Sequence, residues 1–123
     1  MKPCLLFQRA LDTTSTDFTV ADLVLEGPTR GSIIITQIFV TPRVVTTAGS
    51  TIRIHHTQNS SEPSTSNVVM LVNVSAYDDY RGRQKSAPFD TKIVLAPGDR
   101  IYAHLHAEGA GTVTAYGLKP NYE

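Results

Sequence analysis

The chain has 123 residues, which suits one domain; 41% are hydrophobic and 18% charged, enough for a core and too apolar for global disorder. Eleven basic residues balance eleven acidic ones, and a formal net charge of zero argues against a dedicated nucleic-acid-binding protein, which needs a basic patch. Copies of a neutral chain do not repel one another, so this composition suits a subunit of an assembly.

The first 30 residues form the least regular part of the sequence. "CLLFQRAL" (4–11) fits either a strand or a short helix, whereas "FTVADLVLEG" (18–27) has the pattern of a strand. Residues 1–30 are therefore expected to be an N-terminal arm that packs on a neighbour, or else the first strands of the fold. Residues 31–123 are expected to form a β-sandwich domain.

The N-terminal residues also indicate the cellular compartment in which the protein is made. The single cysteine, Cys4, cannot form an intrachain disulfide, so the fold does not require an oxidising compartment. The apolar run after Lys2 is interrupted by Arg9 and is too short for a signal-peptide core or a membrane span. We expect synthesis in the cytoplasm and no membrane partner.

The rest of the chain is a series of short stretches rich in β-branched residues. Strands are expected within 31–42, within 44–57 on either side of a turn at 48–50, within 67–77, and three times within 91–117. Two polar stretches, 58–66 and 78–90, are expected to be loops. Strands at a spacing of about 8–12 residues predict an all-β fold, a single-domain antiparallel β-sandwich of jelly-roll type.

The last three strands are joined by recognisable turn sequences. Pro97-Gly98-Asp99 is expected to turn the first strand into the second. The small residues of 108–111 are expected to form a hairpin into the third.

Two histidines, His104 and His106, are the candidates for metal ligands. On a strand their side chains share one face with Arg100, Tyr102 and Glu108, while the apolar residues between them face the core. The spacing is therefore explained by the polar outer face of an ordinary amphipathic strand. We expect no metal, no other cofactor and no catalytic residue.

The metal hypothesis stays as an alternative because this stretch resembles the start of the first cupin motif, in which two histidines and a glutamate bind a metal. The glutamate of that motif lies four or five residues beyond the second histidine, whereas Glu108 lies two beyond His106, and a second cupin motif is absent. His55 or His56 would have to supply a third imidazole, and adjacent strand residues point opposite ways, so at most one can do so.

The loop 78–90 is the predicted partner-contact segment. It carries Tyr80, Arg81 and Arg83, and Tyr and Arg dominate the energetics of protein interfaces. The alternative for this loop is a solvated segment without a partner.

From about residue 31 to 118 the order of features resembles small β-sandwich virion proteins of tailed bacteriophages, of the head decoration or cement type and the tail accessory type. The resemblance rests on "GSIIITQIFVTP", "GSTIRIHHT", "NVVMLVNV" and above all "IVLAPGDRIYAHLHAEGAGTVTAYGL". It implies a structural role in the virion, with the major capsid protein or another virion subunit as partner, and no active site.

Two predicted strands are apolar on both faces, which predicts a homo-oligomer. In "SIIITQIFV", Ile33, Ile35 and Phe39 are expected on one face and Ile34, Ile38 and Val40 on the other; in "VVMLV", Val68, Met70 and Val72 oppose Val69 and Leu71. A two-layer sandwich buries one face of each sheet, so the second apolar face needs cover. The choice of a trimer comes from the resemblance alone, because decoration proteins often occupy capsid threefold positions.

The expected function is a non-enzymatic capsid decoration protein located in the virion. The alternatives are a tail or fibre accessory protein and a small cupin-like metal-dependent enzyme. A carbohydrate-binding module is disfavoured because the chain has no tryptophan and its tyrosines are scattered.

Overall fold

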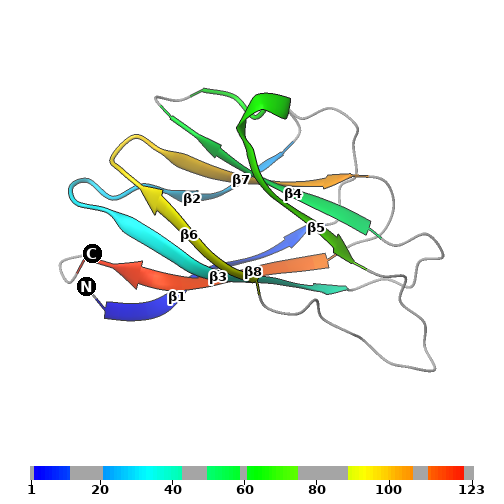
Figure 1. Cartoon of the computed structure of the whole chain (residues 1–123), viewed down its shortest axis with the longest axis horizontal. Helices are drawn as coiled ribbons and strands as arrows, with labels where there is room; N and C mark the ends of the chain where they lie inside the picture. Colours follow the sequence, from blue (N-terminus) through cyan, green and yellow to red (C-terminus); the bar gives the residue numbers. More distant parts are fainter. Residues whose placement is uncertain are drawn as a thin grey trace.

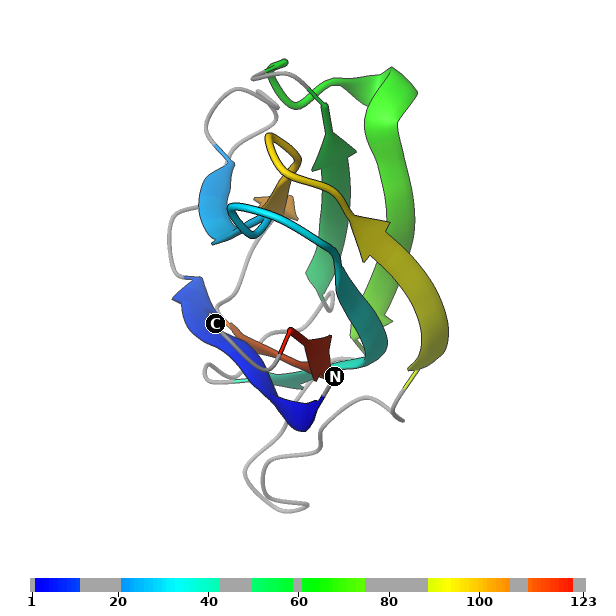
Figure 2. The same cartoon turned by 90° about the vertical axis from the view of Figure 1, so that its left-hand side faces the viewer.

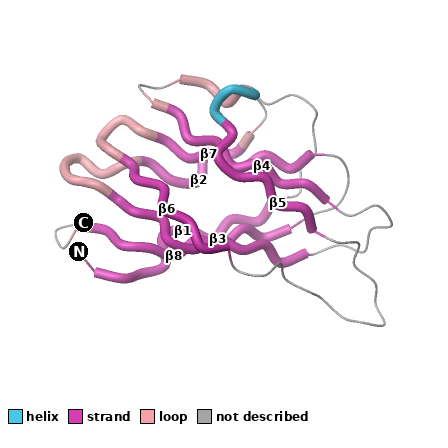
Figure 3. Tube along the Cα trace, in the orientation of Figure 1, coloured by secondary structure: helices cyan, strands magenta, loops and turns pink. Residues whose placement is uncertain are grey.

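A computed structural model describes residues 2–11, 21–42, 50–58, 61–74, 89–106 and 111–120. In these ranges the chain forms strands almost throughout, with one short 3-10 helix (Figure 3). The elements are β1 (Lys2–Leu11), β2 (Asp22–Glu26), β3 (Ile33–Pro42), β4 (Ser50–Thr57), η2 (Thr65–Asn67), β5 (Val68–Val74), β6 (Phe89–Leu95), β7 (Arg100–His106) and β8 (Gly111–Lys119). Within the described part of the chain, no helix is long and apolar enough to cross a membrane.

The strands form two antiparallel four-stranded sheets that pack face to face (Figures 1 and 2). Sheet A has the order β1-β8-β3-β6 and sheet B the order β2-β7-β4-β5. The pairing is nested: the first strand pairs with the last, and each following pair lies inside the previous one in the sequence. The pairs are β1–β8, β2–β7, β3–β6 and β4–β5. The predicted all-β sandwich is confirmed, and β1 and β2 are strands within it.

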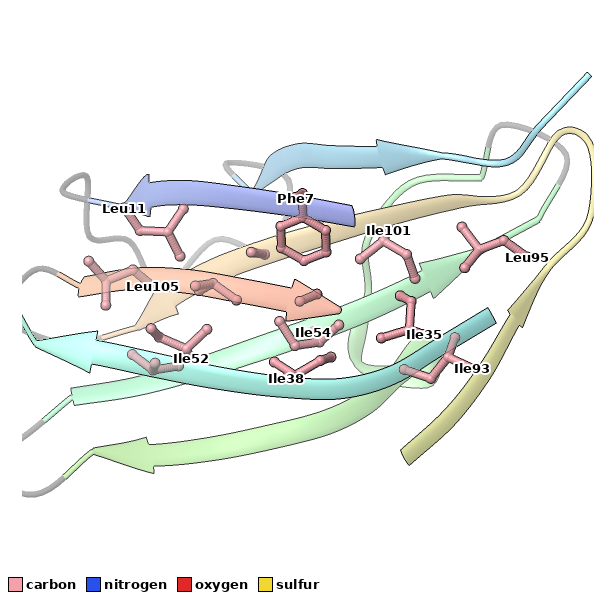
Figure 4. Close-up of a cluster of buried hydrophobic side chains, with 14 of the residues drawn as sticks. Phe7, Leu11, Ile35, Ile38, Ile52, Ile54, Ile93, Leu95, Ile101 and Leu105 are labelled. Atoms are coloured by element: carbon pink, nitrogen blue, oxygen red, sulfur yellow. The ribbon is translucent and has the colours of Figure 1, made fainter. Parts of the chain in front are cut away.

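The space between the sheets is filled by apolar side chains from both layers, which are aliphatic apart from Phe7 (Figure 4). Ile35 and Ile38 of sheet A, and Ile52, Ile54 and Ile101 of sheet B, are completely buried. Alternate residues of each strand supply these side chains, because successive side chains of a strand point to opposite faces. The β-branched residues that predicted the strands therefore also build the core.

A β-bulge in β3 changes which of its residues face the core. Between Ile35 and Gln37, β3 advances two residues while β8 advances one, so Thr36 is an extra residue relative to β8. The register against β6 shifts at the same place, but there the extra residue lies on β6. Ile33, Ile35, Ile38 and Val40 are all buried in the core, whereas Ile34 and Phe39 are only partly buried. The predicted grouping was wrong beyond the bulge, because one added residue reverses the side-chain alternation.

The turn at Pro97-Gly98-Asp99 has the geometry of a type II turn. The amide of Asp99 donates to the carbonyl oxygen of Ala96 at 3.0 Å, and Gly98 has φ of 90°, which glycine accepts without strain. The turn links β6 of sheet A to β7 of sheet B. It thus carries the chain from one layer to the other. The predicted hairpin between β7 and β8 was wrong, because β7 lies in sheet B and β8 in sheet A.

Candidate functional site

His104 lies on β7 but is only 1% exposed. Its neighbours Ala103 and Leu105 belong to the core, so alternation places His104 on the outer face of sheet B, as predicted. On that face the side chain of His104 is buried. The side chain of His106, the last residue of β7, lies outside the described part of the structure.

His55 of β4 joins His104 on this face. The two rings have centroids 6.4 Å apart and are tilted by 58°, and His55 is fully buried. His56 is separated from this pair, because it binds Asp99 at the end of the sandwich. The prediction that at most one of the two adjacent histidines could join His104 is thus consistent with the geometry.

Asn67, at the end of η2, determines that Nδ1 of the His55 ring carries a hydrogen. The Asn67 side-chain nitrogen donates to the Glu62 carbonyl oxygen at 2.9 Å, and its oxygen Oδ1 accepts from the Ser64 amide at 3.0 Å. The amide can therefore be oriented in one way only, with Oδ1 toward His55 Nδ1 at 2.8 Å. It follows that His55 Nδ1 carries a hydrogen and donates it.

This arrangement has one feature of a metal site and lacks another. A ligating histidine usually donates its second ring N–H to an oxygen that orients the ring, as His55 does to Asn67. A catalytic zinc, however, needs three protein ligands. In the described ranges, no group of three His, Cys, Asp or Glu side chains is placed to hold a metal ion, so His55 and His104 provide two imidazoles only.

A second polar cluster lies at the β6–β7 turn. Asp99 Oδ2 is 3.0 Å from His56 Nε2 and accepts from the Ala96 amide at 3.0 Å, with both side chains largely buried. The amide of Gly27 donates to the Asp99 carbonyl oxygen at 2.8 Å. Asp99 thus joins the turn, the end of β4 and the segment after β2.

An open, polar cleft of about 130 Å³ adjoins this cluster. It is lined by Glu26, Gly27, Gly98, Asp99 and Arg100. Arg100 lies 3.8 Å from Glu26, and a side-chain hydrogen bond to Tyr102 raises the pKa of Arg100 above its ordinary value. The cleft therefore carries a permanent positive charge beside two carboxylates and can hold solvent or a very small polar ligand.

Sequence reasoning missed both Asn67 and Asp99 as binding partners of histidines. Asp99 could have been singled out, because it ends a Pro-Gly-Asp turn, where a carboxylate often binds nearby amides. Asn67 carries no local signal, since its role depends on the way η2 folds back on β4. The predicted contact residues Tyr80, Arg81 and Arg83 lie outside the described residues, so their role stays a prediction.

Exposed apolar side chains occur on both sheets. Leu5, Val94 and Tyr116 on sheet A are 48%, 43% and 42% exposed. Leu23, Val69 and Leu71 on sheet B are exposed to a similar degree. The core does not bury these side chains, so both sheets present apolar surface to solvent.

Comparisons with protein-family models, with curated proteins and with solved structures found no match for this chain.

Proposed function

We propose that the protein is a non-enzymatic structural subunit of a tailed-phage virion, in the first place a decoration or cement protein of the head shell. The observation that carries the proposal is the apolar surface on both sheets, with Leu5 and Tyr116 on one and Val69 and Leu71 on the other. Large apolar patches on a small domain usually mark surfaces that bind other proteins. A subunit held between neighbours would bury such surfaces.

The strand arrangement supports the same proposal. The nested pairing of β1 with β8, β2 with β7, β3 with β6 and β4 with β5 agrees with a sandwich of jelly-roll type, an architecture that recurs in viral capsid proteins. The architecture by itself names no function, because one fold serves many. The resemblance of residues 31–118 to phage virion proteins supplies the remaining argument, and it also favours a homotrimer.

The test is to locate the chain in purified phage particles. We expect mass spectrometry of virions from the source phage to find it at high copy number, and a cryo-EM map to place it on the outside of the head. A position on the tail would favour the tail or fibre accessory alternative. Virions that lack the chain would contradict both.

Recombinant protein added to particles that lack it tests the predicted contact loop. We expect Tyr80→Ala with Arg83→Ala to weaken particle binding at least tenfold, since Tyr and Arg are enriched among the hot-spot residues whose truncation costs about 2 kcal/mol or more. Arg30→Ala, which removes an exposed cation between β2 and β3, is the matched control and should bind as wild type does. Undiminished binding of the loop variant would remove the loop from the interface.

A metal-dependent enzyme is the second candidate, favoured by the neighbouring His55 and His104. Elemental analysis of the purified protein separates the two functions. Stoichiometric metal that dialysis does not remove would favour the enzyme.

A further inference from the structure

The outward face of sheet A is uncharged over three of its four strands. The registers pair β1 with β8 and β8 with β3, and directly opposite residues share a face. The outward residues are Pro3, Leu5, Gln8 and Ala10 of β1, Thr112, Thr114, Tyr116 and Leu118 of β8, and Ile34, Gln37, Phe39 and Thr41 of β3. The exposed charges Asp90 and Lys92 lie on β6, at one edge of the sheet.

The apolar members of this face are contiguous. Ile34 lies directly opposite Leu118 on one side and Val94 on the other. Leu5 lies opposite Tyr116, whose ring stacks on Phe39 with centroids 6.2 Å apart. The result is one aliphatic row beside an aromatic pair, and aromatic residues are enriched at the centre of protein interfaces.

Polar groups on this face already bind one another. Gln8 Nε2 donates to Thr114 Oγ1 at 3.3 Å, and Thr36 Oγ1 donates to the Tyr116 carbonyl oxygen at 3.3 Å. Removing water from a polar group is costly when it has no other partner. Because these groups keep their hydrogen bonds within the sheet, another surface can cover them at low cost.

We propose that a second copy of this chain packs on the outward face of sheet A, which we call face A. The proposal deepens the proposed structural function and rests on it for the expectation that the chain assembles. Three strands of face A offer no charge that could recognise a charged partner, and the two charges of β6, Asp90 and Lys92, are of opposite sign and lie at the edge. Two such faces therefore meet without net repulsion. Because the formal net charge of the chain is zero, copies do not repel one another at long range.

The area of face A is sufficient for such a contact. With strands about 4.8 Å apart and about 3.3 Å per residue, a four-stranded sheet of this length presents roughly 600 Å². Two faces then bury about 1,200 Å² in total, which lies above the limit of about 1,000 Å² for a specific interface. Contact of face A with face A is isologous, so a twofold dimer is the simplest product. In the homotrimer that the resemblance favours, face A would instead pack on a different surface of the next copy.

The test uses two leucines that are matched in exposure and position. Leu5 on edge strand β1 is 48% exposed, and Leu71 on edge strand β5 of sheet B is 46% exposed. We expect wild type at micromolar concentration to have a mass of twice the 13.4 kDa of one chain in sedimentation or light scattering. Leu5→Lys should raise the dissociation constant by at least about tenfold, since it buries a charge in the contact, whereas Leu71→Lys should associate as wild type does.

Circular dichroism of each variant shows whether it is folded. If Leu5→Lys does not fold, Val94→Lys replaces it, because Val94 is 43% exposed and lies on the same face. A monomeric wild type would overturn the proposal, and so would association that survives the face A substitutions. Any self-association that they abolish supports it, whatever the number of copies. The search for the chain in virions is independent of these masses, so failure of the proposed function and failure of this inference are told apart.

Discussion

Replacing Asn67 with alanine tests the assignment of the His55 proton and the role of η2. The substitution removes the acceptor of the bond from His55 Nδ1 at 2.8 Å, the acceptor for the Ser64 amide and the donor to the Glu62 carbonyl oxygen. His55 is fully buried, so the loss of this partner costs the net worth of a hydrogen bond plus the penalty of a buried, unsatisfied N–H, together about 2 kcal/mol.

The two bonds to backbone groups lie nearer the surface and add roughly 0.5 kcal/mol each, which gives a total loss of about 3 kcal/mol in the free energy of unfolding. A loss of this size lowers the Tm of a domain of this length by about 10 °C. Denaturant titration monitored by circular dichroism measures the first quantity, and a thermal scan measures the second.

Ser66→Ala is the matched control for Asn67→Ala. It removes the exposed hydrogen bond between the Ser64 and Ser66 hydroxyls in the same turn. The bond from the Ser66 amide to Ser64 Oγ and the contact of Asn67 with His55 stay in place. We expect it to cost no more than about 0.5 kcal/mol. The assignment of the His55 hydrogen would be refuted if Asn67→Ala were as stable as Ser66→Ala.

Three further predictions concern the sandwich end and the histidines. Gly27→Ala should lose about 2 kcal/mol of unfolding free energy or more in denaturant titration, because the added Cβ would collide with the Ala96 carbonyl oxygen; a stability equal to wild type would contradict that close approach. Asp99→Ala should lower the free energy of unfolding by about 2 kcal/mol in the same titration, since Asp99 Oδ2 accepts from the Ala96 amide and binds His56. A loss below about 0.5 kcal/mol would show that this cluster contributes little. A chelator should leave the Tm of the wild type unchanged, and a large drop in Tm would instead indicate a structural metal. The substitution His104→Gln should lower the Tm, because His104 is buried.

The strands could be predicted from sequence because the same β-branched residues define them and fill the core. Ile52 and Ile54 alternate with polar residues in the sequence and are both fully buried in the structure. In β3 the alternation fails at Thr36, because a bulge depends on the partner strands and leaves no local mark.

The candidate site was less predictable for a related reason. Alternation identified the face on which His104 lies but not its burial, because burial depends on which segments cover that face. Likewise, the residues of the turn at Pro97-Gly98-Asp99 predicted a turn correctly, but turn chemistry is local and does not specify which sheet the next strand joins.

The nested strand pairing has a consequence for folding. The pair β4–β5 joins residues as close as His55 and Val68, whereas β1–β8 joins Leu11 to Gly111. Closing the longer loop in an unfolded chain costs about 2 kcal/mol more than closing the shorter one. We therefore expect β4–β5 to form early, and each following pair to close only the short loop left by the one before it. We expect the strand β1 to join last, and slowly, as is typical of folds whose contacts are distant in sequence. Until β1 pairs with it, β8, an inner strand of the finished sheet, is an open sheet edge. Another chain can pair with such an edge.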